Sequence, residues 1–172
     1  MLHELREMPI NGNCVSVDNC TSREENMNMN KIQGFPPNYE EIKKFFPTSI
    51  YTIYTWGENL YVHPLNDLEI LPDVELHESI HSKQQKDPVL WWRRYLVDPK
   101  FRLEQEVEAY AKQYAFIVKN VPTKLHKEYL FAYASDLASD MYGLGKSYAQ
   151  MENLIRLTAK GVLLLEKHAG GH

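Results

Sequence analysis

The stretch Leu76–Gln85, LHESIHSKQQ, stands where the chain changes from strand-forming to helix-forming sequence. Asp73 precedes it at a position suited to a helix N-cap, and Glu75 places a negative charge in the first turn, where the helix dipole favours it. The sequence therefore predicts a helix over residues 74–85.

The residues before this helix have the composition of strands. The stretch SIYTIYTWGENLYVHP (49–64) is rich in Ile, Tyr, Thr and Trp, and a Gly-Glu-Asn turn at 57–59 interrupts it. Because β-branched and aromatic residues suit a pleated surface and glycine permits a tight turn, this pattern predicts a β-hairpin. The apolar piece LEIL at 68–71 predicts a third short strand.

The chain before the hairpin is expected to contribute one short helix and a poorly ordered arm. Asn38 follows two prolines as a candidate cap, apolar residues at helical spacing come after it, and Pro47 ends the segment. Residues 1–33 are mainly polar and show neither helical nor strand periodicity. We therefore expect an arm over 1–33 and a single folded domain over 34–172.

The rest of the chain is predicted to be helical, with prolines and a glycine-containing turn between the helices. Beyond residue 85 the predicted helices cover residues 89–96, 101–119, 124–137 and 148–166. The predicted fold class is α+β, with a small antiparallel hairpin or sheet followed by a mainly helical array that carries the 74–85 helix.

Composition excludes several classes of function. The chain has 172 residues, of which 44% are apolar, and this is enough for one domain with a core. Its formal charge of -4 comes without a long basic block, so no nucleic-acid partner is expected. No apolar run approaches the ~20 residues that a membrane span needs, and the N-terminus lacks the pattern of a secretory signal. We expect a cytoplasmic protein in which Cys14 and Cys20 remain thiols.

Residues 77–81, HESIH, match the pattern H-E-x-x-H. In a helix His77 and His81 lie one turn apart and about 40° apart around the axis, as two ligands of one metal ion require. In such sites two neutral imidazoles hold Zn²⁺, and the glutamate, here Glu78, is the general base toward a water that the metal activates. Because the pattern also arises by chance, the assignment needs a third ligand.

The third ligand is expected from the predicted helix 101–119. A histidine after a glycine, as in H-E-x-x-H-x-x-G-x-x-H, is absent, since Gln84 stands where the glycine would be. The helix offers Glu104, Glu106 and Glu108 instead. Its predicted apolar stripe consists of Leu103, Val107, Tyr110, Tyr114 and Ile117. Glu106 lies about 70° from the centre of that stripe and the other two lie farther away, so Glu106 is the preferred ligand.

Further residues are candidates for supporting roles. A developing oxyanion needs a hydrogen-bond donor besides the metal. The two predicted helices after the motif helix offer Arg94, Tyr95, Tyr110 and Tyr114, and Tyr110 is ranked first because it lies one turn beyond Glu106. Gln84 and Gln85 could orient the histidines through their second ring nitrogens, or they could simply end the helix. His63, near the hairpin, could face a cleft or hold a turn.

These residues resemble those of gluzincin-type zincin metallopeptidases, in which H-E-x-x-H is followed downstream by E-x-x-A. The matching residues are HESIH and the stretch EVEA at 106–109. The wider stretch 34–117 looks like the minimal zincin-like peptidases that are common in bacteriophages. The resemblance implies a zincin fold, one zinc ion held by His77, His81 and Glu106, and Glu78 as the catalytic base.

The same resemblance implies a protein or peptide substrate and a phage setting, either in the host cytoplasm or in the virion. In zincins an edge strand beside the active-site helix commonly binds substrate, and the hairpin at 49–64 lies where that strand belongs. The alternative is a hairpin that only covers a helix face.

Three functions remain open from the sequence. The first is a zinc metallopeptidase. The second is a non-catalytic zincin-like protein of a phage particle, in which zinc is structural and phage structural proteins are the partners. The third is a metal-free helical protein in which the motif arose by chance.

Overall fold

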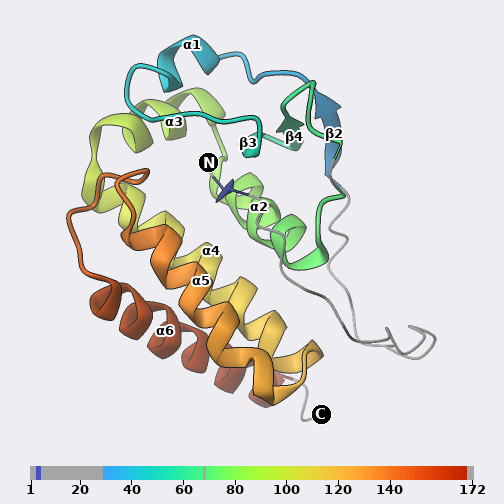
Figure 1. Cartoon of the computed structure of the whole chain (residues 1–172), viewed down its shortest axis with the longest axis vertical. Coiled ribbons are helices and arrows are strands. Elements are labelled where there is room, and N and C mark those ends of the chain that lie inside the picture. The colour runs from blue at the N-terminus through green and yellow to red at the C-terminus, as the bar shows by residue number, and fades with distance from the viewer. Residues whose placement is uncertain (1–2, 5–28, 68, 170–172) are drawn as a thin grey trace.

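A computed structural model describes residues 3–4, 29–67 and 69–169, and within these ranges it holds one small sheet and six α-helices. Helix α2 lies between the sheet and helix α4, and α5 and α6 pack against α4 and against each other (Figure 1). The α+β class predicted from the sequence is confirmed. None of the helices in the described ranges combines the length and apolar character that a membrane crossing requires.

The predicted hairpin is present as β3 (Thr52–Trp56) and β4 (Asn59–Val62). The two strands are antiparallel, with Trp56 opposite Asn59. Gly57 makes the turn with a φ of 59°, in the left-handed region that favours glycine. Strand β3 is buried along most of its length, because α2 covers it.

Two further strands widen this sheet. Strand β2 (Asn30–Gln33) runs parallel to β4, and the two-residue strand β1 (His3–Glu4) is antiparallel to β3. The strand order is β1-β3-β4-β2, so the sheet is mixed and not wholly antiparallel. The expectation of a poorly ordered arm over 1–33 therefore differs from the structure at β1 and β2, whose backbones pair without a strand-like side-chain pattern. Residues 5–28, with both cysteines, lie outside the described ranges.

The strand expected at 68–71 is wrong for the part that is described. Residues 69–71 form no strand, and residue 68 lies outside the described ranges. Ile70 is instead buried in a cluster with Ile53, Leu60 and Val74. Its apolar side chain serves packing against the hairpin just before α2 begins.

The helices agree with their predicted ranges to within about three residues, except that the first is shorter. They are α1 (Tyr39–Ile42), α2 (Pro72–Gln84), α3 (Pro88–Val97), α4 (Pro99–Asn120), α5 (His126–Ala138) with the short 3₁₀ helix η1 (Thr123–Leu125) before it, and α6 (Tyr148–Ala169). Helices α2, α3 and α4 each have proline near the start, where a missing N–H costs nothing. Asp73 is not the N-cap of α2: Leu71 holds that position, and the Asp73 carboxylate turns inward.

Apolar clusters on both sides of α2 hold these layers together. One joins α3 to the sheet through Trp92, Tyr95 and Tyr54, and the other joins α4, α5 and α6 around Leu137 and Ile155. Between them, the facing sides of α2 and α4 carry buried polar residues. The fold therefore encloses a polar layer inside an otherwise apolar interior.

Asp98 caps α4 and gives a first testable consequence. Its Oδ1 accepts hydrogen bonds from the N–H groups of Lys100 and Phe101. The bond from Phe101 is the main reason that the Asp98 pKa lies below its ordinary value. A carboxylate whose pKa is lower in the folded than in the unfolded state stabilises the fold at pH values above its unfolded-state pKa of about 4. This stabilisation is lost as the pH falls through the folded-state pKa. Asparagine caps without titrating. We expect the melting temperature of wild type to exceed that of Asp98→Asn at pH 7, with the difference shrinking below about pH 4; a pH-independent difference would contradict this.

Candidate metal centre

Three potential metal ligands meet between α2 and α4. His77 and His81 come from α2 and Glu106 comes from α4, and one ligand atom of each lies within 4.8 Å of the others. The two Nε2 atoms are 3.1 Å apart. The Glu106 carboxylate oxygens lie 3.6 Å from His77 Nε2 and 3.7 Å from His81 Nε2. The structure thus brings together the three residues that the sequence singled out.

The spacing of these atoms fits a single small cation. Two nitrogens held about 2.05 Å from one tetrahedral zinc ion are about 3.3 Å from each other, and a carboxylate oxygen in the third position is about as far from each. The distance between the two nitrogens and the distance from His77 Nε2 to Glu106 Oε2 differ from these values by a few tenths of an ångström, while the 3.7 Å distance to His81 Nε2 is from the other oxygen, Oε1. Glu106 Oε2 has no hydrogen-bond partner among the described residues although it is buried, as expected for an atom reserved for a cation.

The second nitrogen of each imidazole is held by a glutamine side chain. His77 Nδ1 lies 2.8 Å from Gln113 Oε1, and His81 Nδ1 lies 2.7 Å from Gln84 Oε1. An amide oxygen only accepts hydrogen bonds, so each Nδ1 carries the hydrogen, and a neutral imidazole in this tautomer presents a lone pair at Nε2. Both lone pairs are then directed toward the same small region, which is the arrangement that a bound cation stabilises.

Glu106 is positioned by a tyrosine from α3. The Tyr95 hydroxyl donates to Glu106 Oε1 at 2.6 Å, and both side chains are fully buried. Burial, and then the charge of Glu106, raise the Tyr95 pKa well above its ordinary value, so the phenol remains a donor. Helix α3 therefore orients the ligand carboxylate without supplying a ligand of its own.

Glu78 lies on the same helix as the two histidines and is held from the sheet. The Thr55 hydroxyl of β3 donates to Glu78 Oε2 at 2.6 Å. The other oxygen, Oε1, has no hydrogen-bond partner among the described residues. Burial raises the pKa of the Glu78 carboxyl, and the nearby His77 partly opposes this. One oxygen of this carboxylate is therefore fixed while the other remains able to accept a proton.

The two buried carboxylates between α2 and the neighbouring elements, Glu78 and Glu106, require a balancing positive charge when they are ionised. Glu78 and Glu106 are both fully buried. An ionised carboxylate that is buried without a partner is strongly disfavoured, whereas a divalent cation would balance both. The electrostatics of the site thus agree with its geometry.

The two other glutamates considered as ligands lie outside this cluster. Glu104 is exposed, and Glu108 is half-buried, forming an ion pair with Lys112 and accepting from Gln84. The predicted apolar stripe of α4 is misplaced, however. Leu103 and Val107 are only partly buried, whereas the inward face consists of Arg102, Glu106, Ala109, Tyr110, Gln113 and Ile117. Polar contacts with α2, and not hydropathy, decide which side of α4 faces inward.

The supporting residues are only partly where the sequence placed them. Tyr110 packs the edge of its ring against His77, with ring centroids 4.5 Å apart, while its hydroxyl lies 3.0 Å from that of Tyr142. The structure thus pairs its hydroxyl with a second tyrosine. His63 accepts from the Leu65 N–H in a turn beside β4. Sequence reasoning missed Gln113, although it lies two helical turns from Glu106 and so on the same side of α4.

Of the two roles predicted for Gln85, the structure shows the helix end: Gln85 is the C-cap of α2, and its side chain ties α2 to the hairpin. It accepts from the Gly57 N–H and donates to the Thr55 carbonyl, each at 2.9 Å. We expect Gln85→Leu to lower the free energy of unfolding by about 1–3 kcal/mol, because it leaves the Gly57 N–H without its partner. Denaturant titration measures this. Metal affinity should not change, and a matching fall in affinity would show that the hairpin helps to form the metal cluster.

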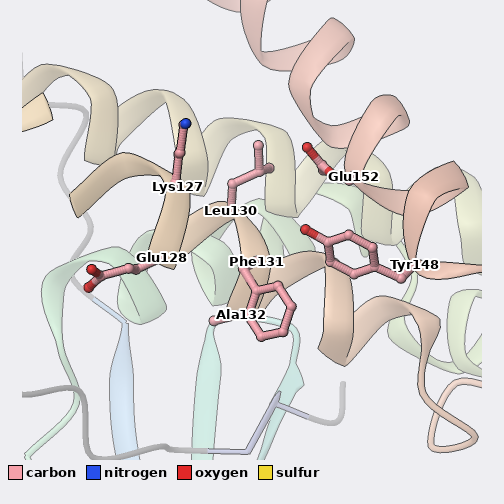
Figure 2. A pocket seen from close by; sticks show the side chains of 7 residues that line it. All are labelled: Lys127, Glu128, Leu130, Phe131, Ala132, Tyr148 and Glu152. Carbon is pink, nitrogen blue, oxygen red and sulfur yellow. The ribbon is translucent and has the colours of Figure 1, made fainter. Parts of the chain in front are cut away.

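A groove on the surface between α5 and α6 is separate from this cluster. It has a volume of about 710 Å³, and Leu130, Phe131 and Tyr148 supply most of its apolar lining (Figure 2). Lys127, Glu128 and Glu152 also line it. None of the potential metal ligands takes part, so this groove contributes nothing to the chemistry of the cluster.

The fold and the site together define an α+β protein with a buried His-His-Glu cluster and a neighbouring glutamate. Comparison with known proteins found no match to this chain among family models, curated proteins or solved structures.

Proposed function

We propose that the protein is a zinc-dependent metallopeptidase with a zincin-like fold. The observation that carries the proposal is the placement of Glu78 beside the His-His-Glu cluster, with one carboxylate oxygen fixed by Thr55 and the other without a partner among the described residues. A structural site with three protein ligands needs no such carboxylate. The resemblance of HESIH and EVEA to gluzincin-type peptidases points the same way.

His77, His81 and Glu106 would hold the ion, and Gln113, Gln84 and Tyr95 would orient these three ligands. A bound zinc ion supplies a Lewis acid that polarises a peptide carbonyl and lowers the pKa of a water toward ~7. Zinc suits this donor set because it accepts imidazole and carboxylate ligands in a tetrahedral site and leaves a fourth position open.

Glu78 would take the proton from the attacking water and then deliver it to the leaving amine. Its Oε1 is the atom for this task, since Oε2 is engaged by Thr55. This contact also ties β3, which lies inside the sheet between β1 and β4, to the site. The resemblance to zincin peptidases implies a peptide or protein substrate, and this is the substrate class that we infer.

A second function is favoured by one observation. His77, Glu78, His81 and Glu106 all have 0% exposure, and a substrate cannot reach a closed site. A non-catalytic protein in which zinc stabilises the fold, for example in a phage particle, would have such a site. The peptidase proposal requires that the site opens.

Metal analysis followed by a search for cleaved proteins tests both functions. We expect one zinc ion per chain in wild type after mild purification, and none in His77→Ala. The peptidase proposal predicts products from a protein mixture that are absent when Glu78→Gln replaces wild type. Stoichiometric zinc without any cleavage would support the structural function, and absence of zinc would refute both.

A further inference from the structure

We propose that Asp73 and Tyr133 set the orientation of His77 through Gln113. Helix α5, which carries Tyr133, would then help to position a metal ligand. The inference rests on the proposed metal site, and it concerns residues that position a ligand without contacting the ion. Together the four side chains form a relay that runs from α5 through the start of α2 to α4 and back to α2.

The first contact of the relay decides which way the Gln113 amide points. Gln113 Nε2 lies 2.8 Å from Asp73 Oδ2. An ionised carboxylate only accepts hydrogen bonds, so the NH₂ group of the amide must face Asp73. The amide oxygen is then the atom that faces His77, at 2.8 Å from Nδ1. Asp73 thereby favours the Nδ1–H tautomer of His77 through Gln113, which contacts both residues.

Tyr133 fixes Asp73 in its turn. Its hydroxyl donates to the same oxygen, Asp73 Oδ2, at 2.6 Å. Burial, and then the charge of Asp73, raise the Tyr133 pKa well above its ordinary value, so that the hydroxyl stays protonated. Two donors on one oxygen, one from α4 and one from α5, leave this carboxylate little freedom to rotate.

Burial makes the relay effective. Gln113 is 0% exposed, Tyr133 is 4% exposed and Asp73 is 7% exposed. Water is therefore poorly placed to replace a lost partner, and a turned amide would place its NH₂ group against the Nδ1–H of His77. The orientation of the ligand thus depends on every contact in the series.

His81 provides an internal comparison. Its partner Gln84 is only partly buried and donates to the Gln105 main-chain carbonyl and to Glu108. These contacts involve α2 and α4 alone. Loss of Asp73 or Tyr133 should therefore affect His77 and leave the tautomer of His81 unchanged.

Imidazole ¹⁵N NMR of the metal-free full chain tests the relay directly. At a pH where both imidazoles are neutral, wild type should show His77 and His81 as Nδ1–H tautomers. In Asp73→Asn, whose side chain can donate as well as accept, we expect His77 to populate both tautomers while His81 does not change. Tyr133→Phe should have the same effect to a smaller degree. An unchanged His77 spectrum in both variants would overturn the proposal.

Zinc affinity, measured by competition with a chelator, gives the second readout. Loss of outer-shell partners typically weakens metal binding 10–100-fold. We expect a fall in this range for Asp73→Asn and a smaller fall for Tyr133→Phe. Tyr129→Phe, on the same helix and without a hydrogen bond to Asp73, is the matched control and should bind zinc as wild type does.

A double variant separates positioning from folding. In Gln113→Glu two carboxylates face each other, so zinc affinity should fall. Adding Asp73→Asn restores a donor opposite the new carboxylate, which still accepts from His77, and zinc affinity should recover at least 10-fold. No recovery would overturn the relay even if the single variants are unstable. If wild type binds no zinc, the proposed function fails, whereas the NMR of the metal-free protein still decides whether the relay exists.

Discussion

Glu78→Gln is expected to retain one zinc ion per chain and to cleave peptide at a rate about 10²–10⁴-fold lower than wild type, the range typical for loss of a general base. The glutamine side chain has nearly the same shape and can still accept from the Thr55 hydroxyl, so the site should keep its structure. What it loses is the ability to take a proton. Metal analysis and initial rates on the same preparation measure the two properties together.

Glu75→Gln is the matched control for that substitution. Glu75 lies on the same helix, two residues before the motif, and pairs with Lys31 of β2 at 3.1 Å near the surface. Glu75→Gln removes this surface charge and should leave both the zinc content and the rate of peptide cleavage as in wild type. Equal rates for wild type and Glu78→Gln would exclude Glu78 as the base, whatever the metal content.

Glu106→Gln should largely abolish the stabilisation that zinc gives to the fold. At a free zinc concentration 100 times its dissociation constant, a bound ion stabilises the wild-type fold by about 2.7 kcal/mol. Loss of a residue that only orients a metal ligand lowers metal affinity about 10–100-fold, so we expect loss of the ligand Glu106 itself to lower zinc affinity at least 100-fold. The same zinc concentration would then stabilise the variant by about 0.4 kcal/mol or less. Denaturant unfolding with and without zinc measures the difference.

Two neighbours on α4 serve as controls. Glu104→Gln alters an exposed side chain. Glu108→Gln weakens the pair with Lys112 but keeps an amide oxygen that can still accept from Gln84, the partner of His81. Both should retain the full zinc-dependent stabilisation. If Glu108→Gln instead lost it while Glu106→Gln kept it, the ligand assignment on α4 would be wrong by two residues.

The elements were predictable where the sequence pattern is local. Aromatic and β-branched residues on either side of Gly57 were enough to place the hairpin, and prolines marked the starts of α3 and α4. The proximity of His77 and His81 could be predicted because residues four apart lie on the same face of a helix. Glu106 was chosen because it lay nearest the apolar stripe, and the structure places it beside both histidines.

The remainder depends on contacts between distant segments, which no local pattern reveals. Strands β1 and β2 form because β3 and β4 offer free edges, so their own sequences need little strand character. The buried face of α4 was misjudged because hydropathy ranks Leu103 above Gln113, whereas the polar face of α2 requires a polar partner. The sequence offered Tyr95 as an oxyanion donor and did not single out Tyr133, and in the structure each hydroxyl instead donates to a buried carboxylate.

Complete enclosure of the three ligands has a kinetic consequence. A chelator cannot reach an ion held among side chains with 0% exposure, so removal must wait for the protein to open. The rate of zinc loss should therefore level off as chelator concentration rises, at a value equal to the opening rate. That plateau would give the upper limit on turnover of the same site, because substrate has to enter through the same opening.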